Sequence, residues 1–390
     1  MRLKRNIFEN IDWWLVLMYV ALTCIGWITI YAALYNEGYE FFDFSKKYGR
    51  QFIWMMIAFF IAIIIMFFNW KFFEGFAYII YFITILSLLG VLIFGTEVNG
   101  AKSWFDFGFF KVQPAEFAKC ATSLVLAKFL STLNIKMSSF RTRIIVTGLI
   151  LTPILFIILQ NDTGSALVYA SFLIVLYRFG LPANVLIFSI ITALIFIASI
   201  IISKIIVISI LVLVAILFFL ISKRGIKEFI IISLSLALSI GFLSSIDYVF
   251  EKVLEPHQVT RIMILLGQES DPQGAGYNVN QSKIAIGSGG LIGKGFLKGT
   301  QTKFNFVPEQ STDFIFCTIG EEWGFIGSTF LLILYGAFLF RLIHIAERQR
   351  SVFSKLYGYG VAGVFFFHIT INIAMTIGLA PVIGIPLPFI

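Results

Sequence analysis

Long apolar runs alternate with short polar segments along most of this chain. A helix needs roughly 20 predominantly apolar residues to cross a bilayer, and such runs recur up to residue 246 and again after residue 312. The pattern predicts an all-α polytopic membrane protein with about eleven transmembrane helices. The predicted spans begin near Trp13, Gln51, Gly75, Pro114, Ile144, Gly164, Ala183, Ile205 and Glu228, and two later spans cover 313–340 and 357–379.

One long segment, 247–312, interrupts the apolar pattern. It is rich in glycine and in charged side chains, above all between Asp271 and Gly299. Because nine predicted spans precede it, the segment lies on the opposite side of the membrane from the N-terminus. We expect a single membrane domain over 1–390, with 247–312 as its large extracytoplasmic loop.

The composition indicates that lipid is the solvent of most side chains. The chain is 59% hydrophobic and 13% charged, with a mean hydropathy of +0.94. A soluble domain is nearer a quarter charged, and no soluble core of this length buries so much apolar surface. The three cysteines, Cys24, Cys120 and Cys317, sit in apolar runs, and neither they nor the scattered histidines have metal-site spacing.

The net charge of +8 is explained by topology and not by a nucleic-acid partner. Lysine and arginine concentrate in the short loops that face the cytoplasm of a membrane protein. Alternate loops of this chain are basic, which places the N-terminus in the cytoplasm and 247–312 outside. The basic loops carry Arg2, Lys4 and Arg5; Lys71; Lys136, Arg141 and Arg143; Arg178; Lys223, Arg224 and Lys227; and Arg341, Arg348, Arg350 and Lys355.

A first polar motif opens the span that begins at Pro114, a residue suited to the first helical position. Glu116 and Lys119 are three residues apart, so they share a helix face and can form an ion pair. Glu116 alone is an ordinary residue for a helix N-terminus. Lys119 lies one turn deeper, where a charge costs about 2.5–3.5 kcal/mol on insertion scales, so we expect it to face the bundle interior or an aqueous cavity.

A second polar motif, 160–165, forms a short outer turn between two spans. Asp162 is placed to cap the helix that follows it. From this signal alone, a capping role is favoured over a role in binding.

The outer segment holds further candidates. Arg261 precedes an apolar patch, 262–266, that suits a short helix on the membrane face, and 280–286 suits another short helix. Gly287, Gly289 and Gly290 permit close approach of the backbone to a ligand. The sequence there matches neither the Walker A pattern nor GxGxxG, so a nucleotide site is rejected.

The start of the next span combines Glu309, Thr312 and Asp313 with the adjacent pair Glu321 and Glu322. Thr312 or Asp313 can cap the helix. Two adjacent carboxylates inside a span repel one another, so at least one needs a partner or must keep its proton. A buried structural pairing with a lysine or a backbone N–H remains an alternative to a functional role.

Together these motifs place acids and bases at the outer half of the bundle. Bases suit an anionic head group such as a diphosphate, and an acid beside it can take a proton from a hydroxyl nucleophile. The residues therefore predict an outer polar cavity that acts on an amphiphilic anionic ligand. The acids are Asp271, Glu309, Asp313 and Glu116, and the bases are Lys119, Lys102, Arg261 and Lys294.

At these positions the chain resembles the SEDS family (shape, elongation, division and sporulation), and within it the RodA branch. The resemblance runs in order through NGAKSW and QPAEFAK, QNDTGSA, HQVTRI, the glycine-rich stretch from ESDPQGAGYN to GFLKGTQ, FVPEQSTDFIF with GEEWGFIG, and NIAMTIGLAPVIGIPLPF. It implies a SEDS-type helical bundle and a peptidoglycan glycosyltransferase that polymerises lipid II into β-1,4-linked strands at the outer leaflet. It also implies a bacterial inner-membrane protein that serves elongation and rod shape with a class B penicillin-binding protein.

The resemblance assigns roles residue by residue. Asp271 matches the family's essential aspartate, as general base on the acceptor hydroxyl or as ligand of a divalent cation, Mg²⁺ or Mn²⁺, beside the diphosphate. Glu116 and Lys119 match the family's QPxExxK motif, and Lys119 is expected to neutralise the leaving diphosphate. The candidate substrate-binding residues are Lys102, Glu116, Lys119, Asp162, Arg261, Gln281, Ser282, Lys294, Glu309 and Asp313.

The chain also departs from the family pattern. Asn161 stands where the QPDxGT motif has proline, and 183–246 holds three predicted helices where one is expected. The family continues beyond PLPF into a last helix, so we expect that the sequence is truncated at its C-terminus. A lipid II flippase or other lipid transporter, and a non-catalytic scaffold for the penicillin-binding protein, remain alternative functions.

Overall fold

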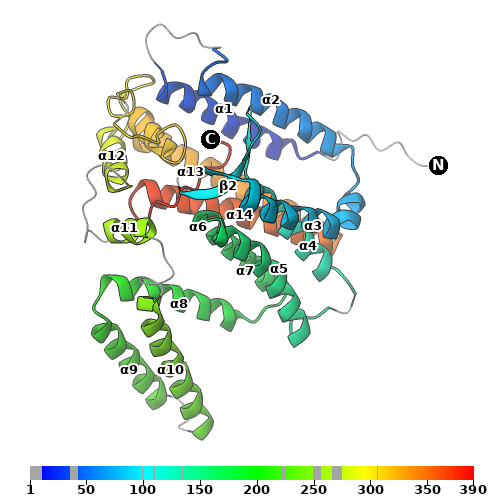
Figure 1. Ribbon diagram of the computed structural model, residues 1–390, viewed down its shortest axis with the longest axis vertical. Helices are drawn as coiled ribbons and strands as arrows, with labels where there is room; N and C mark the ends of the chain where they lie inside the picture. The colour runs from blue at the N-terminus through cyan, green and yellow to red at the C-terminus, as the bar shows by residue number, and fades with distance from the viewer. Residues whose placement is uncertain are drawn as a thin grey trace, which may run out of the picture. The chain divides into compact units, whose positions relative to one another are not determined.

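A computed structural model describes residues 11–35, 43–98, 100–108, 110–133, 135–221, 225–248, 256–265, 275–304 and 306–390 (Figure 1). The chain forms two compact units. The first comprises Met1–Leu181 together with Tyr277–Ile390, and the second comprises Pro182–Gly276.

The first unit is a bundle of helices with one small antiparallel sheet. The sheet has the order β1-β2-β3 and follows α3 directly in the chain. Its strands are β1 (Thr96–Val98), β2 (Ala101–Asp106) and β3 (Lys111–Val112). The helices are α1 (Trp13–Ala33), α2 (Lys47–Met66), α3 (Trp70–Phe94), α4 (Pro114–Leu130), α5 (Phe140–Leu159), α6 (Thr163–Val168), α7 (Phe172–Arg178), α12 (Ala275–Ser288), α13 (Ile315–Arg348) and α14 (Val352–Thr376), with a 3₁₀ turn, η2 (Tyr169–Ser171), between α6 and α7.

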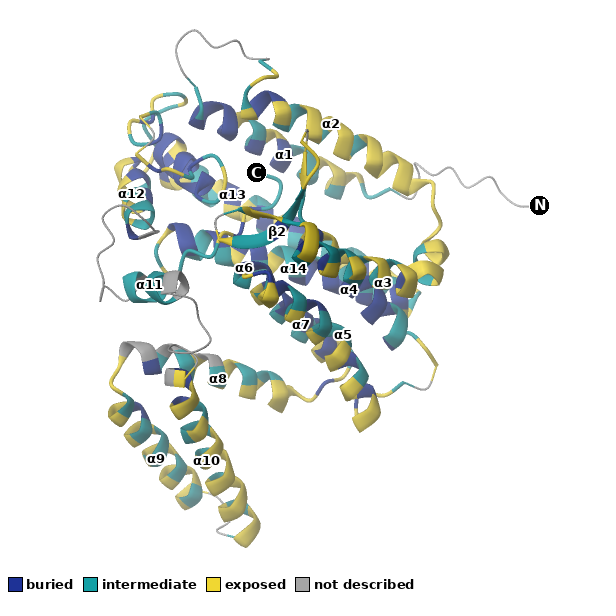
Figure 2. Ribbon diagram, viewed as in Figure 1, coloured by how far each residue is buried: buried dark blue, intermediate teal, exposed yellow. Residues whose placement is uncertain are grey.

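The second unit contains α8 (Ala183–Ile201), α9 (Lys204–Ile221), α10 (Ile226–Tyr248) and α11 (Pro256–Leu265). The three helices predicted within 183–246 are therefore present. Few of their side chains are buried, apart from a small cluster of Val207, Leu243 and Ile246 (Figure 2). Helices that are apolar all round and poorly buried in protein are those that a bilayer can cover.

Eight helices of the described part of the chain are long and apolar enough to cross a membrane. They are α1, α2, α3, α5, α9, α10, α13 and α14. The other three predicted spans correspond to α4, to the broken helix Thr163–Arg178 and to α8. The prediction of an all-α polytopic membrane protein is confirmed, and the division of 1–390 into one domain and a large loop stays a prediction.

Polar side chains decide where several helices begin. The side chains of Asp12, Asn69 and Asp162 accept backbone N–H groups of the first turns of α1, α3 and α6, which satisfies donors that lack an intrahelical partner. The predicted cap at Asp162 is thus confirmed. The predicted cap of α13 by Thr312 or Asp313 is wrong: the N-cap position is Phe314, without a side-chain cap. Thr312 instead donates its hydroxyl to Glu309 within the preceding turn.

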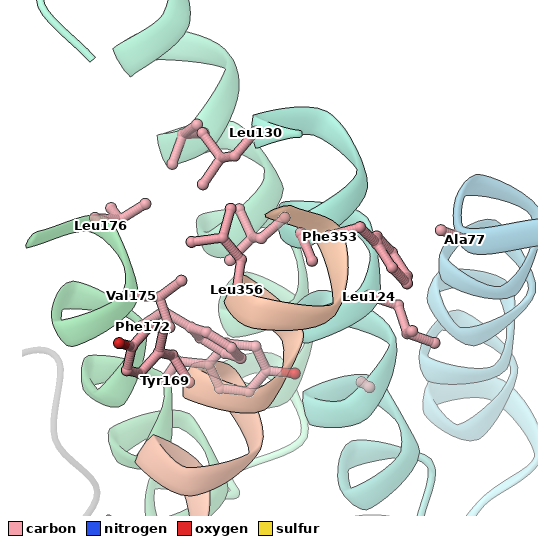
Figure 3. Packing of buried hydrophobic residues seen from close by; sticks show 14 of the residues in the cluster. Ala77, Leu124, Leu130, Tyr169, Phe172, Val175, Leu176, Phe353 and Leu356 are labelled. Carbon is pink, nitrogen blue, oxygen red and sulfur yellow. The ribbon is translucent and has the colours of Figure 1, made fainter. Parts of the chain in front are cut away.

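Helix α4 lies at the centre of the main hydrophobic core of the first unit. Its residues pack against α3, α5, α7 and α14, and most of its side chains are buried. Figure 3 shows Leu124 of α4, Phe172 of α7 and Leu356 of α14 in this cluster. A charged side chain on the buried face of such a helix must find its partners inside the bundle.

The C-terminal segment 377–390 is not helical, yet it lies inside the first unit. Ile385 and Leu387 are buried, and a side chain at Gly164 would overlap the carbonyl oxygen of Ile383. Asn372 of α14 donates to the carbonyls of Ile385 and Asp313, both at 2.7 Å. Irregular backbone at membrane depth is tolerated where protein surrounds it and supplies hydrogen bonds.

Candidate active site

The N-terminal turns of α4 carry an ion pair between a buried lysine and a partly exposed glutamate. Lys119 is 2% exposed, and its Nζ lies 2.7 Å from Oε1 of Glu116 and 2.7 Å from Nε2 of His368 on α14. The Glu116 side chain keeps 44% of its surface exposed. The predicted ion pair and the predicted orientation of Lys119 into the bundle are confirmed.

A cavity of about 390 Å³ lies between α4, α14 and the C-terminal segment. Its polar wall consists of the cluster formed by Glu116, Lys119 and His368, together with the nearby Cys120, Ser123 and Tyr357. The rest of its lining is apolar: Val361, Val364, Phe365, Pro386, Pro388 and Phe389. A cavity with a cationic group on one wall and apolar side chains on the other suits an amphiphile with an anionic head group.

His368 was not among the predicted site residues. The three histidines of the sequence have no metal-site spacing, so spacing alone does not single out His368. The signal that could have found His368 is its position inside an apolar run, VFFFHITI, because a titratable side chain within a span needs a polar partner. Its other ring nitrogen, Nδ1, lies 3.5 Å from the carbonyl oxygen of Pro386.

Asp162 is tied to the start of α4. Its Oδ2 accepts a hydrogen bond from Gln113 Nε2 at 2.6 Å, and its Oδ1 accepts the backbone N–H of Ser165 at 3.0 Å. Gln113 directly precedes the first residue of α4. Asp162 therefore fixes the α6 N-terminus against the helix that carries Glu116 and Lys119.

Lys102 has a structural contact of its own. Its Nζ donates to the carbonyl oxygens of Leu92 and Ile93, at 2.9 and 3.2 Å. These are carbonyls of the last turn of α3, where a cation is favourable. The described contacts of Lys102 thus cap α3.

Lys294 and Glu321 form a second ion pair, 2.7 Å apart. Glu321 is fully buried and also accepts the backbone N–H groups of Thr300, Gln301 and Thr302 at 2.8–2.9 Å. Its neighbour Glu322 accepts the backbone N–H of Leu297 at 3.1 Å. Glu321 and Glu322 therefore have the structural partners that the sequence left as an alternative, namely a lysine and backbone N–H groups.

Four other candidates lie around α12, α14 and the turn before α13. Ser282 is buried and donates to the carbonyl oxygen of Thr376 at 2.9 Å, which joins α12 to α14. Its neighbour Gln281 is partly exposed. Glu309 accepts the Thr312 hydroxyl at 2.8 Å, and Asp313 accepts Asn372 through its backbone carbonyl.

The binding role of every candidate stays a prediction, and two of the candidates fall outside the described residues or in the second unit. Asp271 falls within 266–274, outside the residues that the structure describes. Arg261 belongs to α11 of the second unit. Among the described residues, no three histidine, cysteine, aspartate or glutamate side chains gather to hold a metal ion, and a cation at Asp271 stays a prediction.

The chemical capacity of the cluster follows from donor counting. An ammonium group has three N–H donors and no acceptor. Within the described part of the chain, Glu116 and His368 lie within hydrogen-bond distance of Lys119 Nζ, which leaves one donor for a ligand. The cluster can therefore bind one oxygen of an anion at the polar wall of the cavity.

One family model matches the chain almost throughout, over residues 12–210 and 205–390. It describes the cell cycle protein family of FtsW, RodA and SpoVE. The chain belongs to this family. The resemblance to the SEDS family is thus confirmed.

Curated relatives cover most of the chain. The peptidoglycan glycosyltransferase RodA of Treponema pallidum is 34% identical, over 97% of this chain and 92% of its own. The peptidoglycan glycosyltransferase MrdB of Escherichia coli is also 34% identical, over 82% of this chain and 73% of its own.

Solved structures show the same fold. A chain from a study of how a peptidoglycan synthase complex coordinates polymerization and crosslinking matches with a TM-score of 0.70 and 24% identity, over 97% of this chain and 91% of that chain. The rod shape determining protein RodA of Thermus thermophilus matches with a TM-score of 0.61 and 24% identity, over 97% and 89%.

Proposed function

We propose that this protein is a peptidoglycan glycosyltransferase that polymerises lipid II into β-1,4-linked glycan strands at the outer leaflet. Two curated relatives at 34% identity carry the name of this activity. The observation that carries the proposal is the Glu116–Lys119 pair at the polar wall of a largely apolar cavity. A polyprenyl diphosphate has the matching chemistry, an anionic head on an apolar chain.

Lys119 acts on the leaving group in this proposal. When the bond between the sugar anomeric carbon and the diphosphate oxygen breaks, negative charge grows on that oxygen. The unused N–H of the Lys119 ammonium donates to it, and a charge-assisted hydrogen bond in a dry site is strong. Glu116 holds the lysine ammonium in one direction, which lowers the reorganisation needed as the charge develops.

Asp271 acts on the nucleophile. The acceptor sugar hydroxyl attacks the anomeric carbon of the donor, its proton passes to the Asp271 carboxylate, and the electron pair of the broken bond leaves with the lipid diphosphate. The role of Asp271 rests on the family motif, and Mg²⁺ or Mn²⁺ at this carboxylate stays part of the proposal. The role of Lys119 does not depend on that cation.

The proposed setting is the bacterial inner membrane, with the N-terminus in the cytoplasm and a class B penicillin-binding protein of the elongation machinery as partner. One structural neighbour comes from a peptidoglycan synthase complex, which supports such a partner. Ion pairs join the ends predicted to be cytoplasmic: Arg341 pairs with Asp12, and Arg178 and Lys355 pair with Glu347. These pairs bring the helix ends together at one end of the bundle, as the predicted orientation requires.

The test is polymerisation of purified lipid II by the detergent-solubilised protein with its partner. Wild type is expected to form glycan strands and release polyprenyl diphosphate, and Asp271→Asn is expected to form none at equal amounts of folded protein. Strand formation by Asp271→Asn would show that Asp271 is not the general base. Absence of strands with wild type, combined with rapid Asp271-independent crossing of labelled lipid II in vesicles, would favour a transporter instead.

A further inference from the structure

His368 is a buried titratable residue to which the mechanism above gives no role. It is 6% exposed and lies on α14, 249 positions along the chain from Lys119. Burying a polar side chain without hydrogen bonds is unfavourable, so the groups that its two ring nitrogens contact indicate its role. Nε2 faces Lys119 Nζ at 2.7 Å, and Nδ1 faces the Pro386 carbonyl oxygen at 3.5 Å.

The contact with Lys119 fixes the form of the ring. A lysine ammonium can only donate, so Nε2 must offer its lone pair and cannot carry a hydrogen. A protonated imidazolium would place a second positive charge 2.7 Å from the ammonium. The ring is therefore neutral, with its hydrogen on Nδ1 directed at Pro386, and the hydrogen bond of one nitrogen sets the tautomer at the other.

Geometry then makes the ring a support for the lysine. Glu116 is half-exposed and attached to the same helix, so it restrains the ammonium from one side only. His368 restrains the ammonium from a different helix, and the Nδ1 of its ring contacts the C-terminal segment at the Pro386 carbonyl oxygen. That segment is held by Asn372 and by the Tyr335 hydroxyl, which donates to the Pro388 carbonyl oxygen.

We propose that His368 is a positioning residue, which accepts one N–H of Lys119 and so aims the remaining N–H at the diphosphate of the ligand in the cavity. This proposal rests on the proposed function for the identity of the ligand. It adds a residue that acts on Lys119 alone and does not itself touch the reacting atoms. It also makes the C-terminal segment part of the active-site support, through Pro386.

The experiment measures the affinity of the purified full chain for undecaprenyl diphosphate in detergent. His368→Leu is expected to weaken binding about tenfold or more, because a hydrogen bond to a charged group is lost. His368→Gln is expected to stay within about threefold of wild type, since the amide oxygen replaces the Nε2 lone pair. The dissociation constant is measured at a temperature where each variant is fully folded, since a partly unfolded sample binds more weakly in proportion to its competent fraction. Rescue by His368→Gln is the readout that a merely structural role would not give.

A double-mutant cycle isolates the route through Lys119. If His368 acts only by aiming Lys119, then His368→Leu added to Lys119→Met weakens binding by less than about twofold further. Additive losses of affinity in the double variant would overturn the proposal. So would a His368→Leu variant that binds as tightly as wild type, or a His368→Gln variant that binds as weakly as His368→Leu. Absence of binding by wild type would also overturn it. The matched control is His344→Leu, the same change at an exposed histidine of α13, which is expected to leave binding unchanged.

Polymerisation of lipid II is measured on the same samples to separate this proposal from the proposed function. If the cycle behaves as expected while wild type forms no strands, the glycosyltransferase fails and the positioning role survives. If wild type forms strands while the cycle is additive, His368 loses its role and the glycosyltransferase survives.

Discussion

Two lysine–glutamate pairs in this bundle have the same length and opposite character. In the Lys119–Glu116 pair the lysine is 2% exposed and the carboxylate 44%, with 2.7 Å between the charged atoms. In the Lys294–Glu321 pair the carboxylate is fully buried and the lysine 25% exposed, again at 2.7 Å. Distance alone does not distinguish them.

The difference lies in the hydrogen-bonding capacity that each pair leaves unused. Glu321 accepts Lys294, three backbone N–H groups and the Thr302 hydroxyl, so its oxygens are saturated. It holds the turn at 300–302 in place. Lys119 keeps one donor and lines a cavity. A buried charge marks a binding site where a hydrogen-bonding position stays open, and marks a structural clamp where none does.

The largest predicted effect breaks the clamp. In Glu321→Gln the amide turns N–H donors toward the backbone N–H groups of 300–302 and removes the charge that faces Lys294. Breaking a buried pair in this way destabilises by about 3–5 kcal/mol. We expect a strongly lowered unfolding temperature in detergent. Glu322→Gln, which alters the acceptor of one backbone N–H from Leu297, is the matched control and should lose much less.

A smaller effect is predicted where the cavity is supported. A Cβ at Gly164 would overlap the Ile383 carbonyl oxygen, so Gly164→Ala must displace the C-terminal segment. Overpacking of this kind costs about 1–3 kcal/mol, and we expect polymerisation to fall with it. Gly148→Ala on α5, where a Cβ meets nothing within 4 Å, should change neither stability nor activity. Equal behaviour of the two alanine variants would contradict the packing of the C-terminal segment.

The smallest effect concerns an ion pair at the opposite end of the bundle. The Arg341 guanidinium lowers the pKa of Asp12 below its ordinary value of 3.8. The stabilisation that ionised Asp12 gives to the folded protein is therefore complete above the ordinary pKa. It is lost as the pH falls through the lowered pKa of the folded state. The unfolding temperature of wild type should decline below about pH 4 more than that of Asp12→Asn. Because the pair is close to the surface, high salt should reduce this difference.

The elements that follow from apolar runs were predictable from the sequence. The spans, the cap at Asp162 and the inward direction of Lys119 depend on local pattern and on the cost of a charge in lipid. Several predicted helices begin a few residues later than the observed ones, as at Gln51 against Lys47, because polar residues belong to the first turn.

The partners of each charge were not predictable, because they come from distant segments. Lys102 contacts the end of α3 and Lys294 contacts the start of α13, although both have the same chemistry as Lys119. His368 reaches Lys119 across 249 positions. The sequence states which side chains need partners, and the packing of helices decides which ones they find.

The most direct test of this contrast is the lipid II polymerisation rate of Lys119→Met, per mole of folded protein and beside its unfolding temperature. We expect a rate lower by a factor of about 10²–10³, as for the loss of a donor to developing charge, with an unfolding temperature close to wild type. A polymerisation rate equal to that of wild type would mean that Lys119 does not act on the leaving group and is no more than a second clamp.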